Sequence, residues 1–266
     1  MTEISGGRVA GLPLRALVPN AVTMLAMCAG ATGIRFAIGG DFDKAAAAIV
    51  IAGVLDGVDG RIARLLKGTS RFGAELDSLS DVTAFGLAPA LVLYLWTLQH
   101  LGNVGWVVAL LYAVCCALRL ARFNAALDTV DLPIKRLGYT TGIPAPVGAG
   151  LVLTPLFLWL SGVSDWFDPE VRSVSAAVVT VIVGLLMISS LPGWGWKSVR
   201  VPPQGRLWVL LAVAVFAAAL AQAPWITLTA LSLAYALTFP FASLVYARQR
   251  RMELRPPEAD LSPDID

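Results

Sequence analysis

Four aspartates are the residues of this sequence that are best suited to chemistry. They lie in the stretch DGVDGRIARLLKGTSRFGAELDSLSD, residues 56–81, in which Asp56 and Asp59 are three apart and Asp77 and Asp81 are four apart. On a helix, either spacing puts both side chains on one face, with Cβ atoms about 5–6 Å apart. Carboxylates so close together repel one another unless a cation lies between them, and Mg²⁺ and Mn²⁺ prefer such hard oxygen ligands. The spacing therefore predicts a metal site that also takes substrate phosphate oxygens.

The helices that must position these acids are predicted to cross a membrane. The sequence is 57% apolar and 14% charged, with a mean hydropathy of +0.74, whereas about 25% of a soluble domain is charged. A helix needs about 20 apolar residues to span the bilayer core. The candidate stretches are 17–38, 45–66, 75–98, 104–122, 143–160, 174–191, 207–222 and 225–245. We expect an all-α fold, a polytopic transmembrane bundle of about eight helices.

The distribution of basic residues predicts the orientation of this bundle. With these helices, every Lys and Arg except Arg35, Lys44 and Arg172 falls on one side, and loops rich in positive charge stay in the cytoplasm. Both termini and the active site are therefore expected on the cytoplasmic side of the cell (plasma) membrane. The expected organisation is a cytoplasmic segment (1–16), a membrane domain (17–246) and a disordered cytoplasmic tail (247–266).

The topology predicts that the two aspartate pairs meet. The second helix runs toward the cytoplasm and the third returns after a short loop at 67–72, so all four acids can face one another. Asp56 lies about 15 Å from the end of its helix at a rise of 1.5 Å per residue, which places the cluster below the membrane surface. An intramembrane acid costs about 2.5–3.5 kcal/mol and therefore needs a partner. Arg64 supplies a positive group for a phosphate.

Other residues offer weaker chemistry. Cys28, Cys115 and Cys116 all fall in predicted helices, and neither a disulfide framework nor a zinc site suits their spacing. His100 is the only histidine and falls in a short outer loop. Nucleic acid is not expected as a partner, because no compact basic domain lies outside the membrane. For Gly57, close helix packing remains an alternative to ligand approach.

The pattern D-x-x-D-G-x-x-A-R-x8-G-x3-D-x3-D is matched at every fixed position from Asp56 to Asp81. It resembles the signature of the CDP-alcohol phosphotransferases. The resemblance implies that Mg²⁺ or Mn²⁺, as two ions, is held by Asp56, Asp59 and Asp77, with Asp81 completing the acidic set and acting as the catalytic base. The CDP-lipid contacts implied by the family or expected beside its motifs are Asn20, Thr23, Gly60, Ala63, Arg64, Ser70 and Gly73.

Three further segments resemble bacterial CDP-diacylglycerol:serine O-phosphatidyltransferases of the actinobacterial type. They are ALRLARFN (117–124), GIPAPVGAG (142–150) and LMISSLP (186–192). The resemblance implies CDP-diacylglycerol and L-serine as substrates, phosphatidylserine and CMP as products, membrane lipids as partners and a homodimer.

The acceptor site is expected near the end of the fourth predicted helix. Serine carries a carboxylate, for which an arginine is a suitable partner, so Arg119 and Arg122 are candidates, and Asn124 is a further one. Snorkelling arginines that contact no substrate are the alternative. The other open alternatives are a different acceptor, such as inositol phosphate or glycerol phosphate, and a divalent-cation transporter, since intramembrane acids also mark ion pathways.

Overall fold

The computed structural model describes residues 14–66, 70–127, 140–163, 168–189, 192–193 and 206–253. Within these residues the fold is helical apart from one pair of two-residue strands. Four helical segments are long and apolar enough to cross a membrane, namely Leu17–Ile38, Arg71–Trp96, Asn103–Ala125 and Pro169–Ile188. The chain is therefore a multi-pass membrane protein of helical architecture, as the composition predicts.

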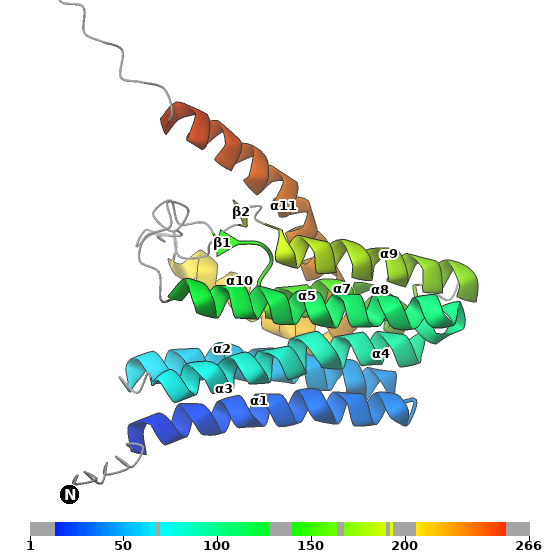
Figure 1. Ribbon diagram of the computed structural model, residues 1–266, viewed down its shortest axis with the longest axis horizontal. Helices are drawn as coiled ribbons and strands as arrows, with labels where there is room; N and C mark the ends of the chain where they lie inside the picture. Colours follow the sequence, from blue (N-terminus) through cyan, green and yellow to red (C-terminus); the bar gives the residue numbers. More distant parts are fainter. Residues whose placement is uncertain are drawn as a thin grey trace, which may run out of the picture.

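The first half of the chain forms one layer of the bundle (Figure 1). Its elements are α1 (Leu14–Ile38), α2 (Phe42–Leu65), α3 (Arg71–Asp81), the π-helical turn η1 (Val82–Leu87) and α4 (Ala88–Trp96). Small residues allow α1 to lie close to its neighbours, because a Cβ on Gly30 would be 2.6 Å from the Ala84 Cα atom and one on Gly33 would be 3.1 Å from the Ala45 carbonyl oxygen. These contacts place α1 against η1 and α2, and α1 also packs against α3.

The second half of the chain contains the remaining described elements. They are η2 (Leu98–Leu101), α5 (Asn103–Leu127), β1 (Thr140–Thr141), α7 (Ala145–Val152), α8 (Thr154–Leu160), α9 (Pro169–Ile188), β2 (Pro192–Gly193), α10 (Arg206–Gln222) and α11 (Pro224–Glu253). Helix α5 packs against η1 on one side and α9 on the other. The N-terminal end of α3 and the C-terminal ends of α2 and α5 lie at one end of the bundle (Figure 1).

Two predicted boundaries differ from the structure. The helix expected at 143–160 is divided at Leu153 into α7 and α8, because Pro155 has no N–H to donate to the preceding turn. Helix α11 continues to Glu253, so 247–253 is helical and not a disordered tail. The rest of the predicted tail, 254–266, and the N-terminal residues 1–13 lie outside the described residues.

Candidate active site

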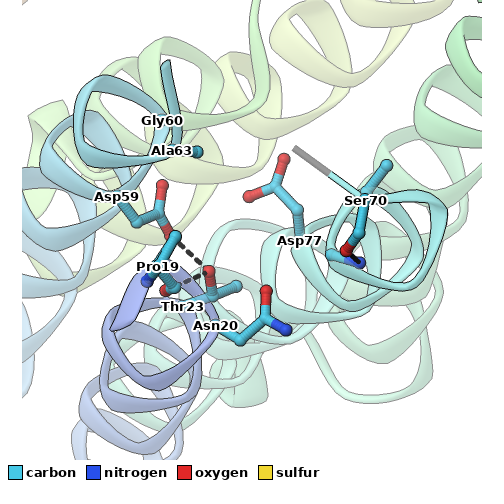
Figure 2. A pocket seen from close by; sticks show the side chains of 10 residues that line it. Pro19, Asn20, Thr23, Asp59, Gly60, Ala63, Ser70 and Asp77 are labelled. Carbon is cyan, nitrogen blue, oxygen red and sulfur yellow. Dashed lines mark hydrogen bonds between the residues drawn. The ribbon is translucent and has the colours of Figure 1, made fainter. Parts of the chain in front are cut away.

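Three of the four aspartates form a compact group of oxygen ligands. One carboxylate oxygen each of Asp56, Asp59 and Asp77 lies within 4.8 Å of the other two. Asp56 and Asp59 come from the last turns of α2, and Asp77 comes from the facing side of α3. Figure 2 shows the side chains of Asp59 and Asp77 pointing into a common space. Three carboxylates that leave other coordination positions open suit Mg²⁺ or Mn²⁺, which keep water or phosphate oxygens as further ligands.

Helix α1 fixes the orientation of Asp59. Asp59 is 4% exposed, and its Oδ2 atom lies 2.6 Å from the Thr23 hydroxyl (Figure 2). The Ser80 hydroxyl donates to the Thr23 carbonyl oxygen at 3.1 Å, so α3 is joined to α1 at the same residue. Because Thr23, Ser80 and Asp59 are all buried, water does not compete strongly for these bonds. The arrangement holds one candidate ligand in a fixed direction.

Replacing Thr23 by valine should weaken metal binding while preserving the side-chain shape. A partner that orients a metal ligand typically contributes about 10–100-fold in metal affinity. We therefore expect Thr23→Val to lower Mn²⁺ affinity by about this factor, measured by titration of the purified protein. Thr32→Val is the matched control, since the Thr32 hydroxyl donates only to the Cys28 carbonyl oxygen on an exposed face of the same helix. Equal affinities for the two variants would contradict the role given to Thr23.

A pocket of about 210 Å³ adjoins these acids. Every predicted CDP-lipid contact except Arg64 lies in its wall. The lining residues are Pro19, Asn20, Thr23, Asp59, Gly60, Ala63, Ser70, Gly73, Ala74 and Asp77. We call this cavity, which is drawn in Figure 2, the first pocket. It combines metal-ligating acids with small residues and hydroxyl or amide groups, a surface suited to a phosphorylated ligand.

Local structure accounts for several residues of the first pocket. The Ser70 hydroxyl oxygen accepts from the Gly73 backbone N–H at 3.0 Å and so caps the N-terminus of α3. A Cβ on Gly73 would lie 3.0 Å from Asn20 Oδ1, so the glycine permits the close approach of α1. A Cβ on Gly60 would meet no described atom within 4 Å, which leaves that backbone open toward the pocket.

Arg64 and Gly57 are outside the lining of the first pocket. Arg64 is exposed, and its Nε–H donates to the Gly60 carbonyl oxygen at 2.9 Å. A phosphate that reaches Gly60 would therefore lie close to the guanidinium group. Gly57 is exposed, and a Cβ on it would have no described neighbour within 4 Å. Close helix packing within the described part of the chain does not explain this glycine.

Asp81 lies one turn deeper than Asp77, at the junction of α3 and η1. Its charged neighbours are Asp56, Asp77 and Arg119, and its buried Oδ1 atom has no hydrogen-bond partner among the described residues. A π-helical turn follows Asp81, and single π turns within α-helices are frequently found at functional sites. Tyr112 stabilises it, because its buried hydroxyl donates to the Phe85 carbonyl oxygen at 2.9 Å. Asp81 therefore lies directly before a π turn that a contact from α5 stabilises.

A second pocket, of about 230 Å³, opens on the other side of Asp77. It is lined by Ala74, Asp77, Ser78, Asp81, Arg119, Leu120, Phe123, Asn124, Pro144, Ala145 and Pro146. The buried Arg119 Nε atom has no hydrogen-bond partner among the residues that the structure describes. Asn124 donates to the Ser78 hydroxyl at 2.9 Å and so joins α5 to α3. Ala74 and Asp77 line both pockets, so ligands in the two would meet at the acids.

Arg122 does not share this position with Arg119. Its Nη1 and Nη2 groups donate to the carbonyl oxygens of Ile188 and Ser189, at 2.9 and 3.3 Å. These carbonyls end α9, and Arg122 is outside the lining of the second pocket. Of the three predicted acceptor residues, the structure therefore brings Arg119 and Asn124 to the pocket and directs Arg122 to a helix end.

Sequence reasoning missed Ser78, Ser80 and Tyr112 as site residues. The two serines of the segment DSLSD, residues 77–81, were an available signal, because a hydroxyl buried within a membrane helix needs a partner. No comparable signal marks Tyr112, since its partner is a backbone carbonyl of the π turn. That contact depends on the packing of α5 against η1.

Comparison with known proteins agrees with this geometry. Residues 16–188 match the family model for CDP-alcohol phosphatidyltransferases, and residues 206–240 match the model for CDP-alcohol phosphatidyltransferase 2. A CDP-diacylglycerol–serine O-phosphatidyltransferase of Mycobacterium leprae is 41% identical over 85% of this chain and 74% of its own length. One from Helicobacter pylori is 36% identical over 69% of this chain and 74% of its own.

One further relative carries the name of a different synthase. The archaetidylserine synthase of Methanothermobacter thermautotrophicus is 33% identical over 65% of this chain and 68% of its own length. The family model extends over α1 to α9 and therefore includes both pockets and all four aspartates. The chain belongs to the CDP-alcohol phosphatidyltransferase family.

Proposed function

We propose that this protein transfers the phosphatidyl group of CDP-diacylglycerol to L-serine, giving phosphatidylserine and CMP. The observation that carries the proposal is the pair of pockets that share Asp77. Asp59 also lines the first pocket, and Arg119 lines the second. The bacterial relatives that carry the name CDP-diacylglycerol–serine O-phosphatidyltransferase support the choice of substrates.

In this proposal the first pocket binds the CDP-lipid. Asp56, Asp59 and Asp77 would hold divalent metal, Mg²⁺ or Mn²⁺ as two ions, and the metal would supply charge neutralisation on the diphosphate. Asp81 lies next to this group. The small side chains of Gly60, Ala63 and Gly73 let the nucleotide diphosphate approach the backbone, and Asn20, Thr23 and Ser70 border it. Arg64 at the pocket edge pairs with a phosphate oxygen.

The second pocket would bind serine. The Arg119 guanidinium pairs with the serine carboxylate, and Asn124 lies beside it. The contact between Arg119 and the carboxylate orients the serine hydroxyl toward Asp81, and Asp81 accepts the hydroxyl proton. The serine oxygen then attacks the phosphorus that bears the diacylglycerol, a new P–O bond forms, and the bond to the leaving CMP oxygen breaks. Asp81 is available for this because its buried Oδ1 atom has no partner among the described residues.

The topology proposed with this activity has about eight membrane helices with both termini in the cytoplasm. Helix α2 would be one of the spans, although its site aspartates and arginines make it more polar than the four apolar segments. The active site would face the cytoplasm at the plasma membrane, and two copies would form a homodimer. The membrane domain would be 17–246, between a short cytoplasmic segment (1–16) and the C-terminal residues. Accumulation of basic residues at the site end of the helices supports this orientation.

The acceptor assay tests the function directly. Purified protein is given CDP-diacylglycerol and Mg²⁺ or Mn²⁺, with labelled serine, inositol phosphate and glycerol phosphate in parallel. We expect metal-dependent CMP release with incorporation of serine alone. Incorporation of another alcohol without serine would reassign the acceptor, and cation flux in liposomes without CMP release would favour a transporter.

A further inference from the structure

Arg122 lies one turn from Arg119 on α5 but contacts the end of another helix. Both of its Nη groups donate to carbonyl oxygens, those of Ile188 and Ser189, at the C-terminus of α9. The last carbonyls of a helix have no partner within that helix and carry the negative end of its dipole. A guanidinium is well suited to them, because it is a fork of donors with a permanent positive charge.

The end of α9 that Arg122 holds also contacts Gly142. This glycine has a φ of +70°, and a Cβ on it would lie 2.7 Å from the Met187 carbonyl oxygen and 3.0 Å from that of Ser189. Just before it, β1 pairs with β2, which follows α9 in the chain. The backbone before α7 therefore rests directly on the carbonyls at the end of α9.

Two residues after Gly142, the same backbone forms a wall of the second pocket. Pro144, Ala145 and Pro146 line that pocket together with Arg119. Ile143, between the glycine and this wall, is 1% exposed, and the fixed φ angles of the prolines leave the wall little freedom to adjust. A shift of the α9 end would therefore move the wall.

We propose that Arg122 is a positioning residue for the acceptor: by clamping the end of α9 against Gly142, it sets the width of the second pocket. This role of Arg122 depends on the proposed function in one respect, which is that the second pocket is taken as the serine site. Arg119 contacts the serine carboxylate, whereas Arg122 acts through α9 and the proline wall. Arg119 therefore discriminates between acceptors by their carboxylate, whereas Arg122 affects the binding of every acceptor that enters the second pocket.

The test compares L-serine with 2-amino-1,3-propanediol, in which a hydroxymethyl group replaces the carboxylate. For Arg122→Gln we expect KM to rise about 10-fold for both acceptors, as for loss of a charge-assisted hydrogen bond. Their kcat/KM ratio and the affinity for CDP-diacylglycerol should stay at the wild-type values. Arg119→Gln is the control, and it should abolish the preference for serine over the diol.

Two further variants separate positioning from a general loss of folding. Gly142→Ala should reproduce the Arg122→Gln result from the other side of the contact, and the double variant should be less than additive, because both changes loosen the same contact. Arg122→Lys keeps the positive charge, so its KM should lie between that of Arg122→Gln and the wild-type value.

An altered serine-to-diol ratio in Arg122→Gln would overturn the proposal, since it would put Arg122 on the carboxylate. Unchanged KM values in both Arg122→Gln and Gly142→Ala would overturn it as well. Absence of serine transfer by the wild-type protein would instead refute the proposed function, so the two failures are distinguishable.

Discussion

Asp81→Asn is expected to lose about 10²–10⁴-fold in turnover, the contribution of a positioned general base, while it still binds CDP-diacylglycerol. Asparagine has nearly the same shape as aspartate but cannot accept the serine proton. Asp81 lies outside the group formed by Asp56, Asp59 and Asp77, so the candidate metal ligands remain. Turnover is measured by CMP release with saturating serine, and CDP-lipid binding by titration of the detergent-solubilised protein.

Asp43→Asn is the matched control for this experiment. Asp43 is an exposed acid in the first turn of α2, on a helix that also carries site acids, and we expect its replacement to leave turnover unchanged. Wild-type turnover in Asp81→Asn would remove Asp81 from the proton-transfer step. Loss of both CDP-lipid binding and turnover in Asp81→Asn would indicate that Asp81 acts mainly as a metal ligand.

Asp77→Ala should abolish metal-dependent binding of the CDP-lipid as well as turnover. Asp77 belongs to the three-aspartate group and borders both pockets, so its loss removes a ligand at the point where the substrates would meet. Replacing a partner that only orients a ligand costs about 10–100-fold in metal affinity, and we expect the loss of a ligand itself to exceed this. Mn²⁺ titration and CDP-lipid binding with and without metal measure the effect. Asp56→Ala should show the same loss of metal-dependent CDP-lipid binding and of turnover as Asp77→Ala.

Glu75→Ala is the control on the same helix. Glu75 is exposed in the first turns of α3 and lines neither described pocket. We expect the metal affinity and turnover of the Glu75→Ala variant to match those of the wild-type protein. Mn²⁺ binding by Asp77→Ala at wild-type strength would show that the three aspartates do not form the metal site.

Local spacing was sufficient to predict which acids could act together. The pairs Asp56–Asp59 and Asp77–Asp81 follow from the helical repeat, and a short connection between the two helices brings their faces together. Apolar composition likewise predicts helices and a membrane location, because an unpaired backbone cannot cross a bilayer. The division of α7 from α8 at Leu153 was not predicted, although Pro155 was a local signal for it.

The partners of long or buried polar side chains were decided by tertiary structure alone. Arg119 and Arg122 share a face of α5 by spacing, yet one lines a pocket and the other reaches the end of α9. Their different roles depend on where a distant helix stops, and α5 itself contains no information about that position. For the same reason the bond between Thr23 and Asp59, residues of different helices, required the packed bundle: a hydrogen-bond partner is fixed by three-dimensional proximity, whereas a helical face is fixed by the repeat of the chain itself.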